Sequence, residues 1–180
     1  MGTFKYIFIL SMALAILSVP CGVLSAKKVV PIMMTISSPA FKDMAEIPLK
    51  YTGYGKSVVP PLIITGTPAN TKSFAIITED PDAMMGTFDH WVIFNIPGSI
   101  REIKEATYPE GSVRGRNSAG STSYYGPHPP AGKPHRYIFT FYALDIMLPL
   151  KEGAGKHDVM KAMEGHILEK AKLTGLFQKK

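Results

Sequence analysis

The sequence predicts a single, mainly β domain with one helix near its C-terminus. Short runs rich in β-branched and aromatic residues recur along the chain and are separated by Gly, Pro and Asn. Two of these runs, residues 74–77 and 137–144, are apolar at nearly every position, as expected for central strands covered on both faces. No internal repeat, low-complexity tract or linker-like segment indicates a second domain.

The strand signals follow one another through most of the chain. Each is a run of four to nine residues bounded by turn-forming residues, which is a usual length for a strand in a globular protein. In chain order, the predicted strands lie at residues 32–37, 47–52, 62–65, 73–78, 88–96 and 137–144.

A helix is predicted over residues 158–173, with Asp158 as its cap and Gly175 as its stop. Gly165 within it costs about 1 kcal/mol relative to Ala, which suggests close approach to another element. Residues 175–178 are predicted to add a final short strand. The periodicity comes from apolar residues at steps of three and four: Val159, Met160, Met163, Ile167 and Ala171.

The first 26 residues have the pattern of a secretory signal peptide. Lys5 supplies a single cation, residues 6–19 form an uncharged apolar run, and small residues precede a cleavage point after Ala26. The run is short for a membrane span of about 20 residues, although an uncleaved anchor extending to Leu24 stays open. We therefore predict an exported protein, periplasmic or extracellular, whose domain comprises residues 27–180.

Cleavage would leave 154 residues, enough to bury a substantial core, and would remove Cys21, the only cysteine. The mature protein would have no disulfide, thiol nucleophile or cysteine metal ligand. Its net charge of +5 is scattered, which gives a weak preference for anionic partners such as membrane head groups, with peripheral contact at most. No basic stripe interleaved with aromatic residues favours a nucleic acid.

Two long segments rich in turn residues, 79–87 and 111–134, lead into core strands. Loops of this length inside a compact domain are usually functional or disordered. Each delivers polar groups to the end of a strand. If those strand ends are neighbours, the following side chains converge: Asp80, Asp82, His90, His128, His135 and Tyr137.

These residues also have ordinary structural interpretations. Asp-Pro-Asp is a common turn sequence, and His90 beside Trp91 is typical of a hydrogen-bonded core histidine. Tyr137 is typical of a core residue, and Arg136 is suited to hold a carboxylate in a bidentate pair. The functional interpretation is favoured because three of the five histidines and two carboxylates gather at the two loop-to-strand junctions.

Three strings carry a family resemblance: DPDAMMGTFDHWVIFNIPG, GRNSAGSTSYYGPHPPAGKPHRYIFTFYALD and MKAMEGHILEKAKLTGLFQ. They resemble the phosphatidylethanolamine-binding protein (PEBP) family, especially its prokaryotic Raf-kinase-inhibitor-like branch, over residues 32–178. The resemblance implies a central antiparallel sheet packed against a smaller second sheet, with peripheral helices. It also implies a small anion-binding pocket built from Asp80, His90, the backbone of residues 126–130 including Gly126, His135 and Tyr137, with Asp82 as the second aspartate of its motif.

Two positions depart from the family pattern. The family often has Pro where this chain has Met84, which implies a softer and more apolar rim. His128 occupies the variable position of the GPxPP motif, commonly a small residue, so it would narrow the pocket or add a cation to it. Both departures bear on which ligand the pocket accepts.

We therefore predict non-catalytic binding of a small anionic or phosphorylated ligand, such as a phospholipid head group, with no cofactor. Imidazole and phenol groups and loop amides can all donate hydrogen bonds to anionic oxygens. Asp80 would accept a hydrogen bond from His90 or His135 and fix its tautomer, or would meet the ammonium of a zwitterionic head group.

Two other functions stay open. Relatives in the resembled family inhibit or modulate proteases and other proteins, so this chain could act on a protein partner. A hydrolase is disfavoured, since the sequence has no G-x-S-x-G, H-E-x-x-H, P-loop or dinucleotide-binding glycine motif. A metal site of Asp80, His90 and His135 is chemically conceivable, but the adjoining proline and tyrosine donors suit an anion better.

Overall fold

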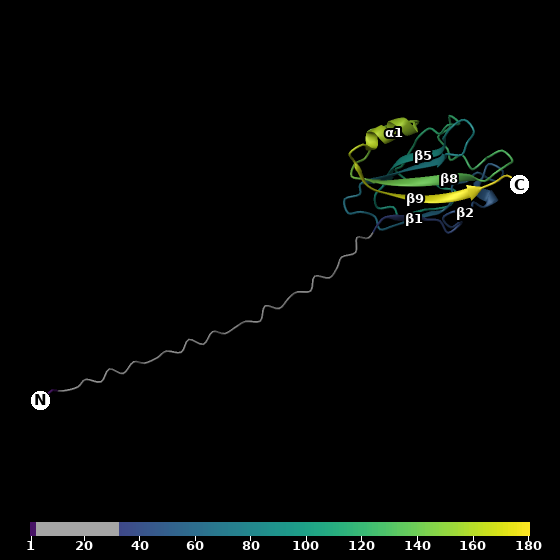
Figure 1. Cartoon of the computed structure of the whole chain (residues 1–180). Coiled ribbons are helices and arrows are strands. Elements are labelled where there is room, and N and C mark those ends of the chain that lie inside the picture. The colour runs from purple at the N-terminus through teal and green to yellow at the C-terminus, as the bar shows by residue number, and fades with distance from the viewer. Residues whose placement is uncertain (3–32) are drawn as a thin grey trace. The chain divides into compact units, whose positions relative to one another are not determined.

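The computed structural model describes residues 1–2 and 33–180, and Figure 1 shows its two sheets and single α-helix. The predicted signal peptide therefore falls almost entirely outside the described residues. Among the residues described, no helix is long and apolar enough to cross a membrane. The elements are β1 (Thr35–Ser37), β2 (Ala45–Glu46), the 3-10 helix η1 (Leu49–Tyr51), β3 (Leu62–Thr65), β4 (Ser73–Asp80), β5 (Phe88–Pro97), β6 (Glu102–Ile103), β7 (Val113–Arg114), β8 (His135–Leu144), α1 (Lys156–Met163) and β9 (Ile167–Phe177).

The larger sheet has six strands in the order β2-β9-β8-β4-β5-β7. Its pairs are antiparallel except for β2 and β9, which run parallel. A smaller antiparallel sheet has the order β1-β3-β6. The two nearly continuous apolar runs form β4 and β8 at the centre of the larger sheet, where both faces are covered. The predicted class, mainly β with a central sheet and a smaller second one, is confirmed.

The larger sheet is covered differently on its two faces. One face packs against the small sheet through large buried side chains such as Trp91, Tyr137 and Phe139. The other packs against α1, whose Val159 and Met163 meet apolar residues of β4 and β5. Burying an aliphatic or aromatic side chain of this size stabilises the fold by about 1.5 to 3 kcal/mol. This packing holds the ends of β4, β5 and β8 in place.

The strand predicted at residues 47–52 is wrong. Its centre forms η1, in which the amides of Tyr51 and Thr52 donate to the carbonyls of Pro48 and Leu49, at 2.9 and 3.1 Å. These bonds are local, so η1 itself needs no neighbouring strand. The amide of Ile47, at the start of the segment, donates to the Leu176 carbonyl of β9 at 2.7 Å, and burial of the Ile47 and Tyr51 side chains accounts for the apolar spacing.

The C-terminal helix is also shorter than predicted. It ends at Met163, and Gly165 adopts a left-handed φ of +77° that reverses the chain. Residues 167–177 then form β9, antiparallel to β8, in which burial alternates with period two from Ala171 to Phe177. The predicted short strand at 175–178 is the end of this longer one. A Cβ at Gly165 would meet nothing within 4 Å, so the close approach predicted there is wrong.

Candidate functional site

Three strand ends meet at one edge of the larger sheet. Because β4 lies between β5 and β8 and is antiparallel to both, its last residue, Asp80, lies beside the first residues of those strands. A pocket of about 160 Å³ opens there. It is lined by Asp80, Ala83, Met84, Phe88, His90, Tyr125, His128, Pro129, Pro130 and His135.

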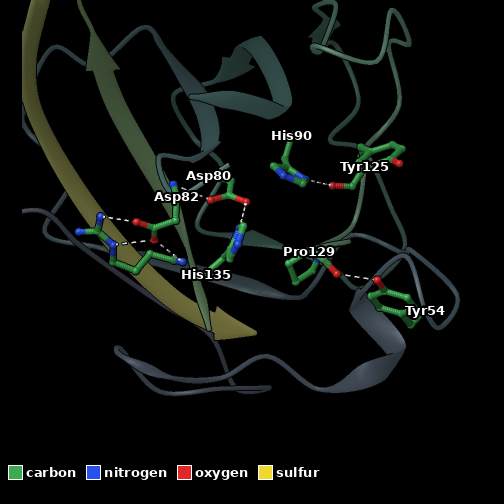
Figure 2. A network of polar contacts seen from close by, with 8 residues as sticks. Tyr54, Asp80, Asp82, His90, Tyr125, Pro129 and His135 are labelled. Atoms are coloured by element: carbon green, nitrogen blue, oxygen red, sulfur yellow. Dashed lines mark hydrogen bonds and ion pairs between the residues drawn. The ribbon is translucent and has the colours of Figure 1, made fainter. Parts of the chain in front are cut away.

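Asp80 orients His135. Its Oδ2 accepts a hydrogen bond from Nδ1 of His135 at 2.7 Å, and its Oδ1 accepts one from the Asp82 amide at 2.8 Å. Both side chains of the pair are buried, and Figure 2 shows the carboxylate held between these two donors. Of the two histidines considered for Asp80, His135 is therefore its partner. The other ring nitrogen of His135, Nε2, remains available to the pocket.

A β-bulge places His90 in the pocket. Thr78 pairs with Trp91 and Glu79 pairs with Asp89, so β5 has one residue more than β4 between these pairs, and that residue is His90. Trp91 faces the core between the sheets, whereas Asp89 meets Lys156 of α1 on the other face. The bulge lets His90 share the inner face with Trp91. Bulges of this kind re-aim a side chain beside functional sites.

The tautomer of His90 follows from its partner. Nδ1 of His90 lies 2.7 Å from the backbone oxygen of Tyr125 (Figure 2). A carbonyl oxygen can only accept, so Nδ1 carries the hydrogen and donates it. Burial lowers the pKa of His90, outweighing the bond to Tyr125 and the nearby Asp80 charge, which act in the opposite direction. Neutral His90 thus has a bare Nε2.

Tyr137 is not among the residues that line the pocket; it lies next to these histidines as a fully buried side chain. Its ring meets the His90 ring edge-on, with 5.1 Å between centroids. Its hydroxyl makes no hydrogen bond to any residue that the structure describes. Burial, reinforced by the nearby Asp80 charge, raises the pKa of Tyr137, so the hydroxyl keeps its hydrogen. Buried hydroxyls normally find a partner, which makes this one a candidate donor to a ligand.

Asp82 does not belong to the pocket lining. Its two oxygens are held by Arg136: Oδ2 accepts from the backbone amide and Nε at 2.9 Å each, and Oδ1 accepts from Nη2 at 2.8 Å. These hydrogen bonds hold the pKa of Asp82 well below its usual range. The bidentate role considered for Arg136 is the one found, and Asp82 supports the site by fixing the turn after β4.

Gly126 likewise supports the pocket without lining it. Its amide donates to Oγ of Ser57 at 2.8 Å, and a Cβ at this position would lie 2.6 Å from the Tyr51 carbonyl oxygen. Only glycine therefore allows the loop to pack this closely against the segment after η1. The same loop is tied down by the Tyr54 hydroxyl, which donates to the Pro129 carbonyl at 2.6 Å. The loop thereby forms one wall of the pocket.

The rim differs in character from the floor. His128 is exposed and its ring lies 4.2 Å from that of Tyr54, measured between centroids. Met84 and Met85 are almost fully exposed, at 86% and 101%, and Met84 lines the pocket. The floor is thus polar and buried, whereas the rim is exposed and combines the apolar Met84 with His128.

Sequence reasoning missed several lining and supporting residues. Tyr125 directly precedes the GPHPP segment and could have been found there, since its carbonyl fixes His90. Tyr54 and Ser57 stand about seventy residues before the loop that they hold, and no local signal marks them. Within the part of the chain that the structure describes, no three His, Cys, Asp or Glu side chains are arranged to hold a metal ion.

Comparisons with known proteins identify chains that are similar to this one in sequence. The family model described as "Phosphatidylethanolamine-binding protein" matches residues 37–178. A UPF0098 protein of Methanothermobacter thermautotrophicus is 46% identical over 151 residues, covering 81% of this chain and 99% of that protein. A UPF0098 protein of Aquifex aeolicus is 42% identical over 153 residues, covering 82% and 90% respectively.

Two solved structures are similar over most of the chain. CT736 of Chlamydia trachomatis, described as a putative PEBP homolog, is 36% identical with a TM-score of 0.79, covering 83% of this chain and 99% of its own. YbcL of E. coli, described as a new member of the mammalian PEBP family, is 28% identical with a TM-score of 0.77, covering 82% and 99%. Both structures therefore support the fold described above.

Proposed function

Because this chain belongs to the phosphatidylethanolamine-binding protein family, we propose that its pocket binds a small anionic or phosphorylated ligand without transforming it. One observation carries the proposal. His90 and His135 both line the pocket, each with Nδ1 engaged elsewhere, so that each Nε2 is left for a ligand. The side chain of Tyr137, whose hydroxyl has no hydrogen-bond partner among the described residues, lies beside them.

The Asp80 carboxylate supports anion binding rather than opposing it. Both of its oxygens already accept hydrogen bonds, one from His135 and one from the Asp82 amide. When His135 is protonated, Asp80 supplies the counter-charge and Nε2 donates to the ligand. A hydrogen bond to a charged group contributes about 1.5 to 3 kcal/mol. A bound anion would then lie on the far side of the ring from Asp80.

The size of the pocket supports a small ligand. Its volume of about 160 Å³ is below the roughly 300 to 1,000 Å³ typical of drug-sized sites. A phosphate or phosphoethanolamine group suits this space, whereas an acyl chain would have to remain outside. Both a lipid head group and a free phosphorylated compound present this chemistry.

Binding without catalysis is supported by what surrounds the histidines. Among the described residues, no Ser, Thr or Cys side chain hydrogen-bonds to His90 or His135. Nucleophilic catalysis needs such a group within reach of its base. The pocket is therefore better equipped to hold an anion than to attack one.

The exposed rim favours a second candidate, modulation of a protein partner. Met84, which lines the pocket, and its neighbour Met85 both expose apolar side chains. Exposed methionines are common on adaptable binding surfaces. Substituting both by Ser should then abolish contact with such a partner while leaving phosphate binding intact, as measured by co-purification and by calorimetry.

Calorimetric titration with inorganic phosphate and with phosphoethanolamine tests the main proposal. Tyr137→Phe and His135→Ala should each weaken binding about ten- to a hundred-fold, because each removes a donor to a charged group. His157→Ala is the matched control, since His157 is exposed on α1 outside this pocket. Unchanged affinity in both pocket variants would show that the ligand binds elsewhere.

A further inference from the structure

We infer that His90 makes the pocket selective for anions that carry their own hydrogen-bond donor, because it offers the ligand an acceptor and not a second donor. This inference rests on the proposed anion binding and adds to it the chemical class of ligand. A phosphate with one P–OH group belongs to this class, and so does a head group with an N–H ammonium. Sulfate does not.

The backbone geometry around His90 carries the argument. The Tyr125 carbonyl takes the hydrogen of Nδ1, and the bulge in β5 holds the ring on the pocket face. Neutral imidazole has one N–H only, so Nε2 must present a lone pair. Nε2 has no hydrogen-bond partner among the described residues. Figure 2 shows the His90 ring between its Tyr125 contact on one side and the Asp80–His135 pair on the other.

The neighbours of His90 do not force it into the cationic form. Asp80 on β4 is the nearest carboxylate, but its oxygens are bonded to His135 and to the Asp82 amide. From β8, His135 opposes a second positive charge beside it, and Tyr137 presents its ring. Burial of the ring acts in the same direction and lowers the pKa of His90. His128 and Tyr125 complete the ionisable residues around the pocket.

The two sides of the pocket therefore differ. His135 in its protonated form and Tyr137 can donate to ligand oxygens, whereas His90 requires a hydrogen from the ligand. An oxygen without hydrogen would meet the His90 lone pair, and the repulsion could be relieved only by protonating a buried imidazole. Sites that hydrogen-bond a substrate O–H discriminate against analogues lacking it, because a buried polar group is left unpaired.

Monohydrogen phosphate and sulfate test this inference directly. At about pH 8 both are tetrahedral dianions of nearly equal size, and of the two only monohydrogen phosphate carries a hydrogen on one of its oxygens. We expect sulfate to bind roughly ten- to a hundred-fold more weakly in calorimetric titrations of the wild-type protein. Sulfate binding should take up one proton more than phosphate binding does, which calorimetry detects by comparing buffers of different ionisation enthalpy.

The results separate this inference from the proposed function. Equal affinities for the two anions would overturn the role of His90 and leave anion binding standing. No binding of either anion would remove both. Titration with glycerophosphoethanolamine and with glycerophosphocholine shows whether the natural ligand is a lipid head group or a free phosphate. Of the two, only glycerophosphoethanolamine has N–H donors, so tighter binding of it indicates a lipid head group. No binding of either compound indicates a free phosphate.

A variant and a spectroscopic measurement complete the test. His90→Gln should bring the phosphate-to-sulfate ratio close to one, whereas His157→Gln on α1 should leave it unchanged. Because the buried substitution could impair folding, the wild-type protein is also measured by nitrogen-15 NMR in complex with phosphate. A bare Nε2 on His90 in that spectrum supports the inference, and a hydrogen on Nε2 overturns it.

Discussion

Asp80 has a role that its charge alone would not suggest. A carboxylate beside an anion site normally repels the ligand, yet here both oxygens are bonded inside the protein and one holds His135 at 2.7 Å. The consequence is that Asp80 orients His135, the residue that faces the ligand, and places a negative charge beside it. Its effect on binding is therefore opposite in sign to the simple electrostatic expectation.

Asp80→Asn should weaken phosphate binding near neutral pH by roughly tenfold, because the counter-charge for His135 is lost. The decrease would occur although the net charge of the protein becomes more positive. Asp145→Asn is a matched control, since Asp145 pairs with His166 at 2.9 Å on the exposed surface. Calorimetry at fixed pH measures both variants. Tighter binding by Asp80→Asn would mean that the carboxylate repels the ligand.

The ion pair of Asp82 and Arg136 should contribute modestly to stability. Arg136 is half-exposed, and exposed pairs contribute little, so Arg136→Ala should lower the free energy of unfolding only slightly. Its bidentate geometry makes a small net contribution credible. Urea denaturation measures the change. Phosphate affinity should decrease less in Arg136→Ala than in Asp80→Asn. An equal or larger decrease in affinity would place Asp82 in the binding site itself.

At the scale of the elements, the boundary between α1 and β9 shows why the sequence predicted too long a helix. Apolar residues at steps of three and four from Val159 to Ala171 fit a helix, but the second half of this run pairs with β8 instead. Strand pairing over eleven residues buries Ala171, Leu173 and Phe177 against the core. Local periodicity cannot report this long-range gain, because the partner strand lies elsewhere in the sequence.

Gly165→Ala tests where α1 ends, because it should change the free energy of unfolding in opposite directions in a continuous helix and at the observed turn. Within a continuous helix the substitution would stabilise the protein by about 1 kcal/mol. At a φ of +77° it should instead destabilise by about 1 to 2 kcal/mol, because Ala is strained in the left-handed region. Thermal or urea unfolding decides between them. Gly155→Ala is the control, since Gly155 has an ordinary φ of −78° and free space around it.

At the scale of the whole molecule, buried titratable groups predict how acid destabilises the fold. His90 has a native pKa below its unfolded value of about 6.5, so the unfolded chain binds the proton more tightly. Its contribution to stability is complete above that pH and falls as the pH decreases below it. Asp82, with its depressed pKa, contributes above about pH 4 and loses that contribution at lower pH.

Urea denaturation between pH 8 and pH 3 should therefore show two successive losses of stability. His90→Gln should flatten the decrease that begins near pH 6.5, and Arg136→Ala should flatten the one below about pH 4. Comparing variants separates these groups from Asp89, whose pKa is raised by burial and which acts in the opposite direction. A wild-type stability that stays constant from pH 7 to pH 5 would contradict the assignment of neutral buried His90.

Export is a prediction about the whole chain. The residues before the domain carry the signal peptide pattern, with small residues preceding a cut after Ala26. Expression in a secreting host should release a protein that begins at Lys27, as read by N-terminal sequencing or intact mass. Exported protein that retains Met1 would indicate an uncleaved anchor instead.

The sequence by itself determined the mainly β class, the two central strands and the family. These rest on signals contained in short segments: apolar runs, turn residues and the strings around Asp80, His90 and His135. It also placed the polar groups at strand ends, because a loop leads directly into each strand. Such features need no knowledge of what a segment packs against.

Tertiary structure decided the rest. It selected His135 as the partner of Asp80, assigned Asp82 to Arg136, and placed Gly126 behind the pocket wall instead of in it. The second half of the predicted helix pairs with β8 as a strand, and β5 has a β-bulge at His90. In each case the deciding energy is a contact or hydrogen bond between residues far apart in the chain, and a local sequence pattern carries no record of its distant partner.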